Sequence, residues 1–247
     1  MVGRLLLRGL LAGALAGLLA FAFARITGEP LIQNAISFEE KIHAEHGHSH
    51  GDETELVSRS TQAGVGLATG VVVYGAAIGG LFALSFAFLY GRVHGVSARS
   101  LSALISVAAF VTVVVVPSLK YPANPPAIGN PETIGLRTEL FFLMIITSVI
   151  VAVFATKVRS RLKRSMGVWK ASTVAGLVYV VIMAALQATL PSIEEVPPEF
   201  PATVLWNFRI TALGIQAILW ATLGLAFGAL AGKCLKPSSA PVRVALR

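Results

Sequence analysis

Four of the five histidines in the chain stand close together, in the stretch HAEHGHSHGD at residues 43–52. Neutral imidazole nitrogens bind divalent first-row transition metals, and nearby carboxylates can add oxygen ligands. Two glutamates precede the cluster, and in a helix they share a face with its first histidine, which lies three and four residues further on. The candidate metal ligands are therefore His43, His46, His48, His50, Glu39, Glu40 and Asp52.

The spacing of these residues indicates what kind of metal site they form. Beyond Gly47 the histidines occupy alternate positions, and Gly51 follows the last of them. This pattern is typical of a flexible segment and not of a preformed cage. A catalytic zinc site needs a motif such as H-E-x-x-H held by supporting hydrogen bonds, and the sequence contains none. We therefore expect exchangeable metal capture with no permanently bound cofactor. A solvated polar loop that binds no metal is the alternative.

The composition is that of a membrane protein. Hydrophobic residues make up 55% of the chain and charged residues 13%, and the mean hydropathy is +0.76. A soluble domain carries roughly 25% charged residues. A bilayer core is crossed by about 20 mostly apolar residues, which must be helical to satisfy their backbone hydrogen bonds. Such stretches run over residues 5–24, 65–90, 101–119, 139–156, 171–190 and 210–231. We expect an all-α polytopic protein, one membrane domain over 1–247 with six transmembrane helices.

The charges indicate how this domain is oriented. Fourteen of the twenty Lys and Arg residues lie at the N-terminus, in the loops after the second and fourth stretches, or in the tail. All twelve Asp and Glu residues lie in or beside the other loops. By the positive-inside rule, both termini, the basic loop 157–170 and the tail 232–247 are cytoplasmic. The His- and acid-rich loop 25–64 and the Pro-rich loop 117–138 are then extracytoplasmic. Because no basic stripe is interleaved with aromatic residues, we expect membrane lipid and no nucleic acid as a partner.

The first apolar stretch has two interpretations. Its basic start, apolar run and Ala-Phe-Ala ending at Ala24 are typical of a cleaved signal peptide. Glycines at intervals of four residues instead favour a retained helix, because small residues let helices approach closely in lipid. The spacing occurs in the first and last stretches, at Gly9, Gly13 and Gly17 and at Gly224, Gly228 and Gly232. We favour a retained helix that packs against the last one.

Polar residues at the outer helix ends could line a vestibule. Five prolines between residues 117 and 131 forbid a helix there and favour a rigid extended path. Arg209 and Gln216 are seven residues apart and share a face of the last helix. The candidate vestibule residues are Lys120, Glu132, Arg209, Gln187 and Gln216. A stiff connector with anchoring side chains and hydrogen bonds between helices would explain the same residues.

Several mechanisms find no support in the sequence. GALAGKC, near the C-terminus, has neither the glycine spacing nor the Ser or Thr of a nucleotide-binding P-loop. No Asp or Glu lies deep in an apolar stretch, where proton relays through membranes usually place one. Cys234 is the single cysteine, which excludes an intramolecular disulfide, and we assign it no role. We expect neither an ATPase, nor a self-contained proton-coupled pump, nor an enzyme.

The outer segments resemble the CbtA family of predicted cobalt transporter subunits. The resemblance covers nearly the whole chain and is carried by GEPLIQNAISFEE, the histidine segment, SRSTQAGVGLATG, LKYPANPPAIGNPETIGLRT and FPATVLWNFRITALGIQAILWATLGL. It implies cobalt uptake linked to cobalamin synthesis, across the bacterial inner membrane. It also implies a small single-span partner of the CbtB type with a His-rich tail. The family is usually described with five spans, whereas this chain has six apolar stretches.

We therefore expect the membrane subunit of an uptake transporter for cobalt(II) or a related divalent metal. In this interpretation the outer His- and acid-rich loop gathers the ion, and the outer vestibule passes it inward. The alternative is a membrane protein that does not transport, either a metal-responsive accessory subunit or a scaffold.

Overall fold

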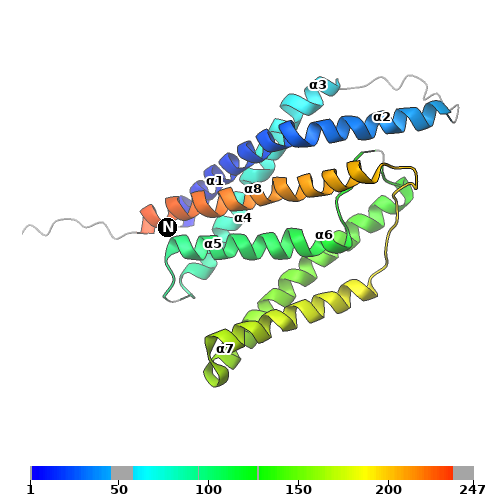
Figure 1. The fold of residues 1–247 in the computed structure, drawn as a ribbon. Helices are drawn as coiled ribbons and strands as arrows, with labels where there is room; N and C mark the ends of the chain where they lie inside the picture. The colour runs from blue at the N-terminus through cyan, green and yellow to red at the C-terminus, as the bar shows by residue number, and fades with distance from the viewer. Residues whose placement is uncertain (1, 46–57, 94, 127, 236–247) are drawn as a thin grey trace, which may run out of the picture.

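The computed structural model describes residues 2–45, 58–93, 95–126 and 128–235, and all regular secondary structure in these ranges is helical. Figure 1 shows the arrangement. The elements are α1 (Val2–Phe23), η1 (Ala24–Gly28), α2 (Glu29–Glu45), α3 (Arg59–Thr61), η2 (Gln62–Gly66), α4 (Leu67–Tyr90), α5 (Ala98–Ala109), η3 (Phe110–Val115), α6 (Val116–Lys120), α7 (Pro131–Thr189) and α8 (Ala202–Leu235).

The short π-helical segments η1, η2 and η3 do not break the helices. The residues that flank them have right-handed helical dihedrals, so each segment continues into its neighbours. Five of the resulting helices are long and apolar enough to cross a membrane. The expected all-α fold is thus confirmed for the described residues, with five helices that could span a membrane. The helix that begins at Val2 continues to Glu45, so the segment 25–64, which we expected to be a loop, begins as helix.

The fourth of the five long helices, α7, contains a reversal. Gly167 has φ 80° and ψ 172°, in a region that glycine enters at far lower cost than other residues. Figure 1 shows the chain turning back within α7, next to its label. The two arms of α7, 131–166 and 168–189, therefore run side by side. The apolar stretches 139–156 and 171–190 lie almost entirely on separate arms. This turn explains why six apolar stretches correspond to five long helices.

Glycines bring α1 and α4 into backbone contact. A Cβ atom on Gly13 would lie 2.1 Å from the carbonyl oxygen of Gly75, and one on Gly79 would lie 2.1 Å from that of Gly9. Only glycine permits so close a crossing. The first helix packs against the last, α8, as predicted, but its glycines lie against α4.

The glycines of α8 are used against α5. A Cβ atom on Gly224 would lie 2.5 Å from that of Ser106, and one on Gly228 would lie 3.1 Å from that of Ser102. The Ser102 hydroxyl donates to the Gly224 carbonyl oxygen over 2.6 Å, and the Ser106 hydroxyl donates to the Trp220 carbonyl oxygen. The two serines are buried, and these bonds satisfy their hydroxyl groups.

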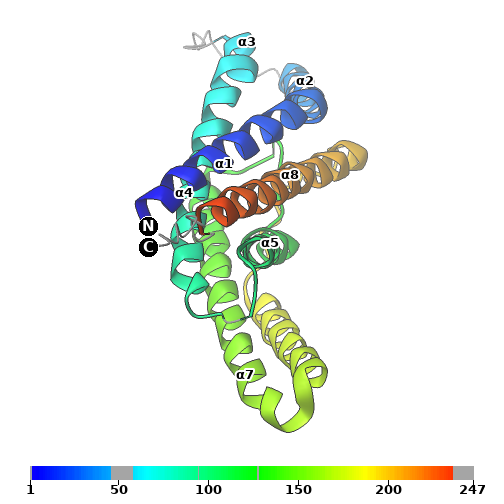
Figure 2. The ribbon, with the colours of Figure 1, turned by 90° about the vertical axis from the view of Figure 1, so that its left-hand side faces the viewer.

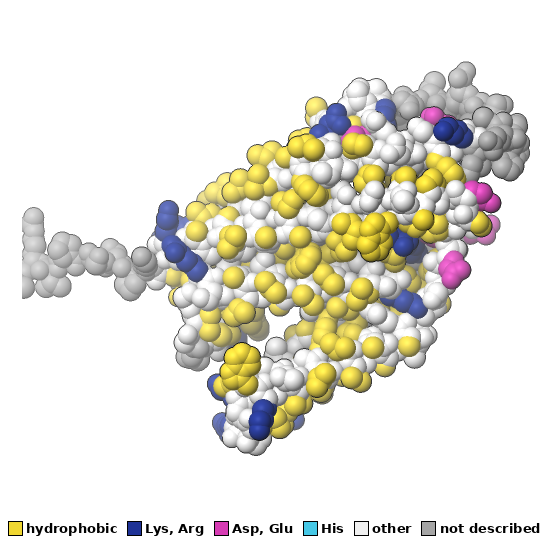
Figure 3. Space-filling model, in the orientation of Figure 1, with side chains coloured by type: hydrophobic (Ala, Val, Ile, Leu, Met, Phe, Trp, Pro, Cys, Tyr) yellow, Lys and Arg dark blue, Asp and Glu magenta, His cyan; other side chains and the backbone are white. Residues whose placement is uncertain are grey.

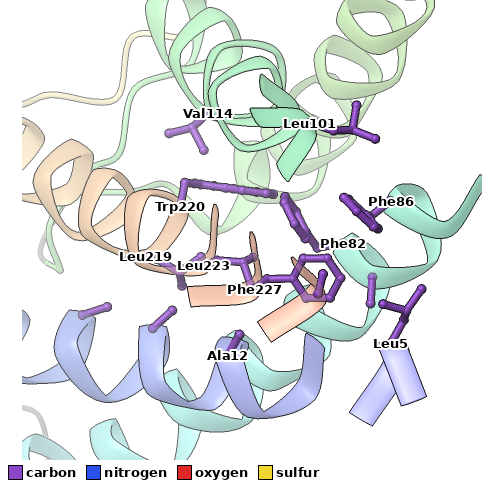
Figure 4. Close-up of a cluster of buried hydrophobic side chains, with 14 residues drawn as sticks. Leu5, Ala12, Phe82, Phe86, Leu101, Val114, Leu219, Trp220, Leu223 and Phe227 are labelled. Carbon is purple, nitrogen blue, oxygen red and sulfur yellow. The ribbon is translucent and has the colours of Figure 1, made fainter. Parts of the chain in front are cut away.

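The main core lies among α1, α4, α5 and α8. Figure 4 shows Phe82 and Phe86 of α4 around Phe227 of α8, with ring centroids 5.3 and 5.0 Å apart in edge-to-face geometry. Leu5 and Ala12 close this cluster from α1. The α7 hairpin stands to one side of it (Figure 2) and has its own cluster with α6, which includes Met144, Met183 and Tyr121.

The two ends of the molecule differ in charge. We call the end formed by loops 121–130 and 190–201 the acidic end, and the end formed by the start of α1, the α4–α5 loop and the turn at Gly167 the basic end (Figure 1). The Asp and Glu side chains visible in Figure 3 all lie toward the acidic end, whereas Lys and Arg also mark the basic end. In this view the acidic side chains therefore gather toward one end, whereas basic side chains occur at both ends.

Replacing Gly13 with Ala should destabilise the protein, because its Cβ would collide with the backbone of α4. We expect Gly13→Ala to lower the free energy of unfolding by about 1–3 kcal/mol, as overpacking does. Gly70→Ala is the matched control, because a Cβ there meets nothing within 4 Å. Thermal unfolding in detergent measures both. Equal stability of the two variants would contradict the crossing.

Candidate functional site

A cavity of about 420 Å³ opens at the acidic end, between α4, η3, α6, α7, α8 and the loop that follows α6. Its apolar wall includes Val114, Ile134, Phe141, Ile145 and Leu213. Its polar wall includes Tyr74, Ser118, Tyr121, Arg137, Arg209 and Gln216. Concave sites with apolar walls and a few convergent polar groups are where small molecules bind.

The Pro-rich loop between α6 and α7 forms the rim of this cavity. Tyr121 leaves the helical conformation, and Asn130 ends the loop by capping α7, its side-chain oxygen accepting from the Glu132 N–H over 3.0 Å. The Tyr121 hydroxyl donates to the Pro191 carbonyl oxygen over 2.8 Å, which joins this loop to the loop after α7. Burial raises the pKa of the Tyr121 phenol above its ordinary value of 10.0, so the hydroxyl remains a donor.

An ion pair with a buried carboxylate fixes α7 against both loops. Arg137 donates from Nη1 to Glu195 Oε2 over 2.8 Å and from Nη2 to the Pro122 carbonyl oxygen over 2.5 Å. Thr133 donates to the other carboxylate oxygen of Glu195 over 2.6 Å. The Glu195 side chain is 3% exposed. Both oxygens of Glu195 are thus occupied within the protein, so this carboxylate is committed to structure.

On the opposite side of the rim, Arg209 donates hydrogen bonds to neutral acceptors only. It donates from Nε to the Ala123 carbonyl oxygen over 3.3 Å and from Nη2 to Asn124 Oδ1 over 3.0 Å. Within the described residues, no carboxylate forms a salt bridge with Arg209. Gln216, two helical turns further along α8, has a buried Oε1 that receives no hydrogen bond.

The five predicted vestibule residues therefore separate into two groups. Arg209 and Gln216 line the cavity, and their role in transport stays a prediction. Lys120 donates to the Ser192 hydroxyl over 3.1 Å, and Gln187 donates to the Val116 carbonyl oxygen over 2.9 Å. Glu132 is exposed in the first turn of α7. These three lie outside the cavity lining, and Gln187 makes the kind of interhelical hydrogen bond that was the alternative interpretation.

None of the predicted metal ligands that the structure describes lines the cavity. Glu39, Glu40 and His43 belong to α2, whereas His46, His48, His50 and Asp52 lie outside the described residues, as does the His43 side chain. Among the residues that are described, no three His, Cys, Asp or Glu side chains form a group that could hold a metal ion.

The two chain segments that lead into the histidine segment are tied together. The Glu29 carboxylate is 3% exposed and lies 2.5 Å from an Nη atom of Arg59. This pair joins the start of α2 to α3, on either side of residues 46–57. An opposite charge at this distance is what a buried carboxylate needs, because an unpaired buried charge is strongly destabilising.

The Arg137–Glu195 pair should stabilise the fold, because removing the buried carboxylate leaves the partly buried Arg137 without its counter-charge and Thr133 without its acceptor. We expect Glu195→Ala to lower the free energy of unfolding by about 1.5–3 kcal/mol, the contribution of hydrogen bonds to a charged group. Its neighbour Glu194 is exposed, so Glu194→Ala should change the stability by less than about 0.5 kcal/mol. Thermal or denaturant unfolding in detergent compares them. A Glu195 variant as stable as the Glu194 variant would show that the pair contributes nothing.

Comparison with known proteins supplies the family. A family model described as "Probable cobalt transporter subunit (CbtA)" matches residues 2–232, a range that includes the cavity, the histidine segment and nearly the whole of the five long helices. No match was found among curated proteins or among solved structures. Because the family model covers nearly the whole chain, the chain belongs to the CbtA family of probable cobalt transporter subunits, as the resemblance of its outer segments indicated.

Proposed function

We propose that this protein is the membrane subunit of an uptake transporter for cobalt(II) or a related divalent metal. The family match over residues 2–232 carries this proposal, and the five long apolar helices support it. A transporter subunit is not an enzyme class, and we assign no catalytic role. The word subunit in the family description supports a partner, which we propose to be a small single-span His-rich protein of the CbtB type.

The proposed topology has six crossings with both termini in the cytoplasm of a bacterial cell, the protein lying in the inner membrane. At about 1.5 Å per residue, arm 131–166 of α7 is about 54 Å long and arm 168–189 about 33 Å. Each exceeds the hydrocarbon core of about 30 Å, so each arm can be one crossing. The basic end then faces the cytoplasm. The backbone contact between α1 and α4 supports a retained first helix, because the fit involves glycines of both.

Metal capture is assigned to the outer segment that follows α2. We propose that His43, His46, His48 and His50, with Glu39, Glu40 and Asp52, gather the ion in an exchangeable way. Cobalt(II) lies below nickel and copper in the affinity order of nitrogen and oxygen ligands. A flexible segment cannot reverse that order, so the metal preference must arise elsewhere. The cavity of Arg209 and Gln216 is the proposed outer vestibule through which the ion moves inward.

A second candidate function is an accessory or scaffold subunit that does not itself transport. One observation favours it: the described residues that line the cavity include two arginines and no carboxylate, which suits a bare divalent cation poorly. Uptake of labelled cobalt separates the two candidates, because only a transporting subunit changes the rate when it is expressed with its partner.

Thiol labelling tests the topology. In a chain whose Cys234 has been replaced, a cysteine at Ser49 should react with an impermeant reagent in intact cells. One at Ser160, on the α7 arm beside the turn at Gly167, should be shielded. Permeabilised cells provide the control, since both positions should then react. The reverse pattern in intact cells would overturn the orientation and the assignment of metal capture.

Uptake measurements test the function and the histidine segment together. Cells that express the chain with its partner should accumulate labelled cobalt faster than cells without the chain. Replacing the four histidines with Ala should raise the half-saturation concentration and leave the preference among cobalt, nickel and zinc unchanged. Because imidazole binds metal only when neutral and has an ordinary pKa of about 6.5, capture should weaken as external pH falls through about 6.

Two outcomes would contradict these expectations. Uptake that does not depend on the chain would refute the transport proposal and favour the accessory role. A metal preference that inverts in the four-histidine variant, or transport that is lost at saturating metal, would make the segment a selectivity site. A variant with Ala at His94, which lies outside the segment, is the matched control for loss of an imidazole.

A further inference from the structure

We propose that the cavity at the acidic end binds a phosphate group, with Arg209 as the main contact. The charges of its wall carry this inference. Arg137 is neutralised by Glu195 over 2.8 Å, whereas the contacts of Arg209 are with a carbonyl and an amide oxygen. The wall therefore holds one positive charge that the described part of the chain does not compensate. A guanidinium in a partly apolar cavity is a strong binder of phosphate oxygens.

The donors around Arg209 fit this ligand. Two of its three nitrogen atoms hold the rim, and the third, Nη1, has no acceptor among the described residues. Tyr74 and Ser118 line the same cavity with hydroxyl groups that make no hydrogen bond to the described chain. Gln216 adds an amide without a partner, and rotation of that amide presents either its oxygen or its NH₂ group to the cavity. The wall, as far as the described residues form it, offers several donors and no acidic group.

The apolar part of the wall indicates the form of the ligand. Phe141, Ile145 and Leu213 line the cavity and provide a surface for hydrocarbon. The cavity lies at the ends of the long helices, where the headgroups of a bilayer would be. A phospholipid with its phosphate at Arg209 and part of an acyl chain against these residues satisfies both walls. Free inorganic phosphate shares the same chemistry and would use the polar wall alone.

Such a ligand would change the electrostatics of the cavity. A phosphate monoanion compensates Arg209, so that the wall becomes neutral and no longer repels a divalent cation. This last step rests on the proposed function, because it matters only if the cavity is the vestibule. The binding site itself does not depend on the proposed function. It is inferred from the contacts of Arg209 and can be tested without transport.

Binding to the purified chain, freed of bound lipid in a phosphate-free detergent, tests the site. Native mass spectrometry with short-chain phosphatidylglycerol and calorimetry with inorganic phosphate are the two assays. Arg209→Gln should weaken binding about tenfold or more, as expected when a charged hydrogen bond is lost. Arg25→Gln is the matched control: Arg25 is an exposed arginine on η1 that does not line the cavity.

Ala212→Phe distinguishes the two sources of phosphate. Ala212 lines the cavity, so a phenyl ring there fills its apolar part without changing any charge. Loss of phosphatidylglycerol binding in both Ala212→Phe and Arg209→Gln identifies a lipid site. Inorganic phosphate that binds wild type and Ala212→Phe but not Arg209→Gln identifies a free phosphate site.

Two results overturn the proposal. One is that wild type binds neither probe. The other is that each probe that binds does so equally to wild type and Arg209→Gln. Should Arg209→Gln fail to fold by thermal unfolding, Arg209→Lys, which keeps the charge but loses the planar fork, takes its place with both probes, and equal binding to wild type and Arg209→Lys overturns the proposal. Cobalt uptake is measured separately, so a failure of transport leaves these binding results unaffected.

Discussion

The close crossing of α1 and α4 is the contact on which the rest of the structure depends. Within lipid there is no water from which apolar surfaces could be removed. Helices therefore associate through packing and hydrogen bonds. Gly9 and Gly13 against Gly75 and Gly79 bring the two backbones together, which lets α8 lie in contact with both. Ser102 and Ser106 then fix the register of α8 against α5. That register decides which α8 side chains reach the cavity.

The cavity lies between the core of α1, α4, α5 and α8 and the α7 hairpin. The α7 hairpin contacts the core through η3 and α6, and its loops are held by Tyr121, Arg137 and Glu195 at the acidic end. At the basic end the hairpin tip extends away from α5 (Figure 2). One wall of the cavity therefore belongs to the core, through Arg209 and Gln216, and another to the hairpin, through Arg137.

The elements were predictable from sequence because apolar length and the lipid environment leave helix as the only choice. The partners of the glycine faces were not, since regular glycine spacing shows that a helix can be approached closely but not by which neighbour. The same limit applies to the polar residues. Gln187 and Gln216 both lie toward the outer ends of helices in the sequence, yet Gln187 bonds a backbone carbonyl and Gln216 faces the cavity.

Glu195 shows the limit most clearly. It has Glu194 beside it in a Pro-rich loop, and nothing in the local pattern distinguishes a buried ion-pair partner from an exposed neighbour. The pairing depends on Arg137, near the start of α7 and 58 residues earlier in the chain. In the sequence Arg137 is only a charge just before the apolar stretch 139–156, and its contact with the loop after α7 gives it a structural role.

The unpartnered oxygen of Gln216 is informative because polar side chains elsewhere in the described fold have partners. A buried polar atom without a hydrogen bond costs about 1–3 kcal/mol. Thr133, Ser102 and Gln187 all have partners within the chain. Four side-chain atoms in the described residues are buried without one, and that of Gln216 alone belongs to the cavity lining. A hydrogen-bonding group that enters the cavity from outside would remove this cost, so the fold leaves at Gln216 a position that a ligand can complete.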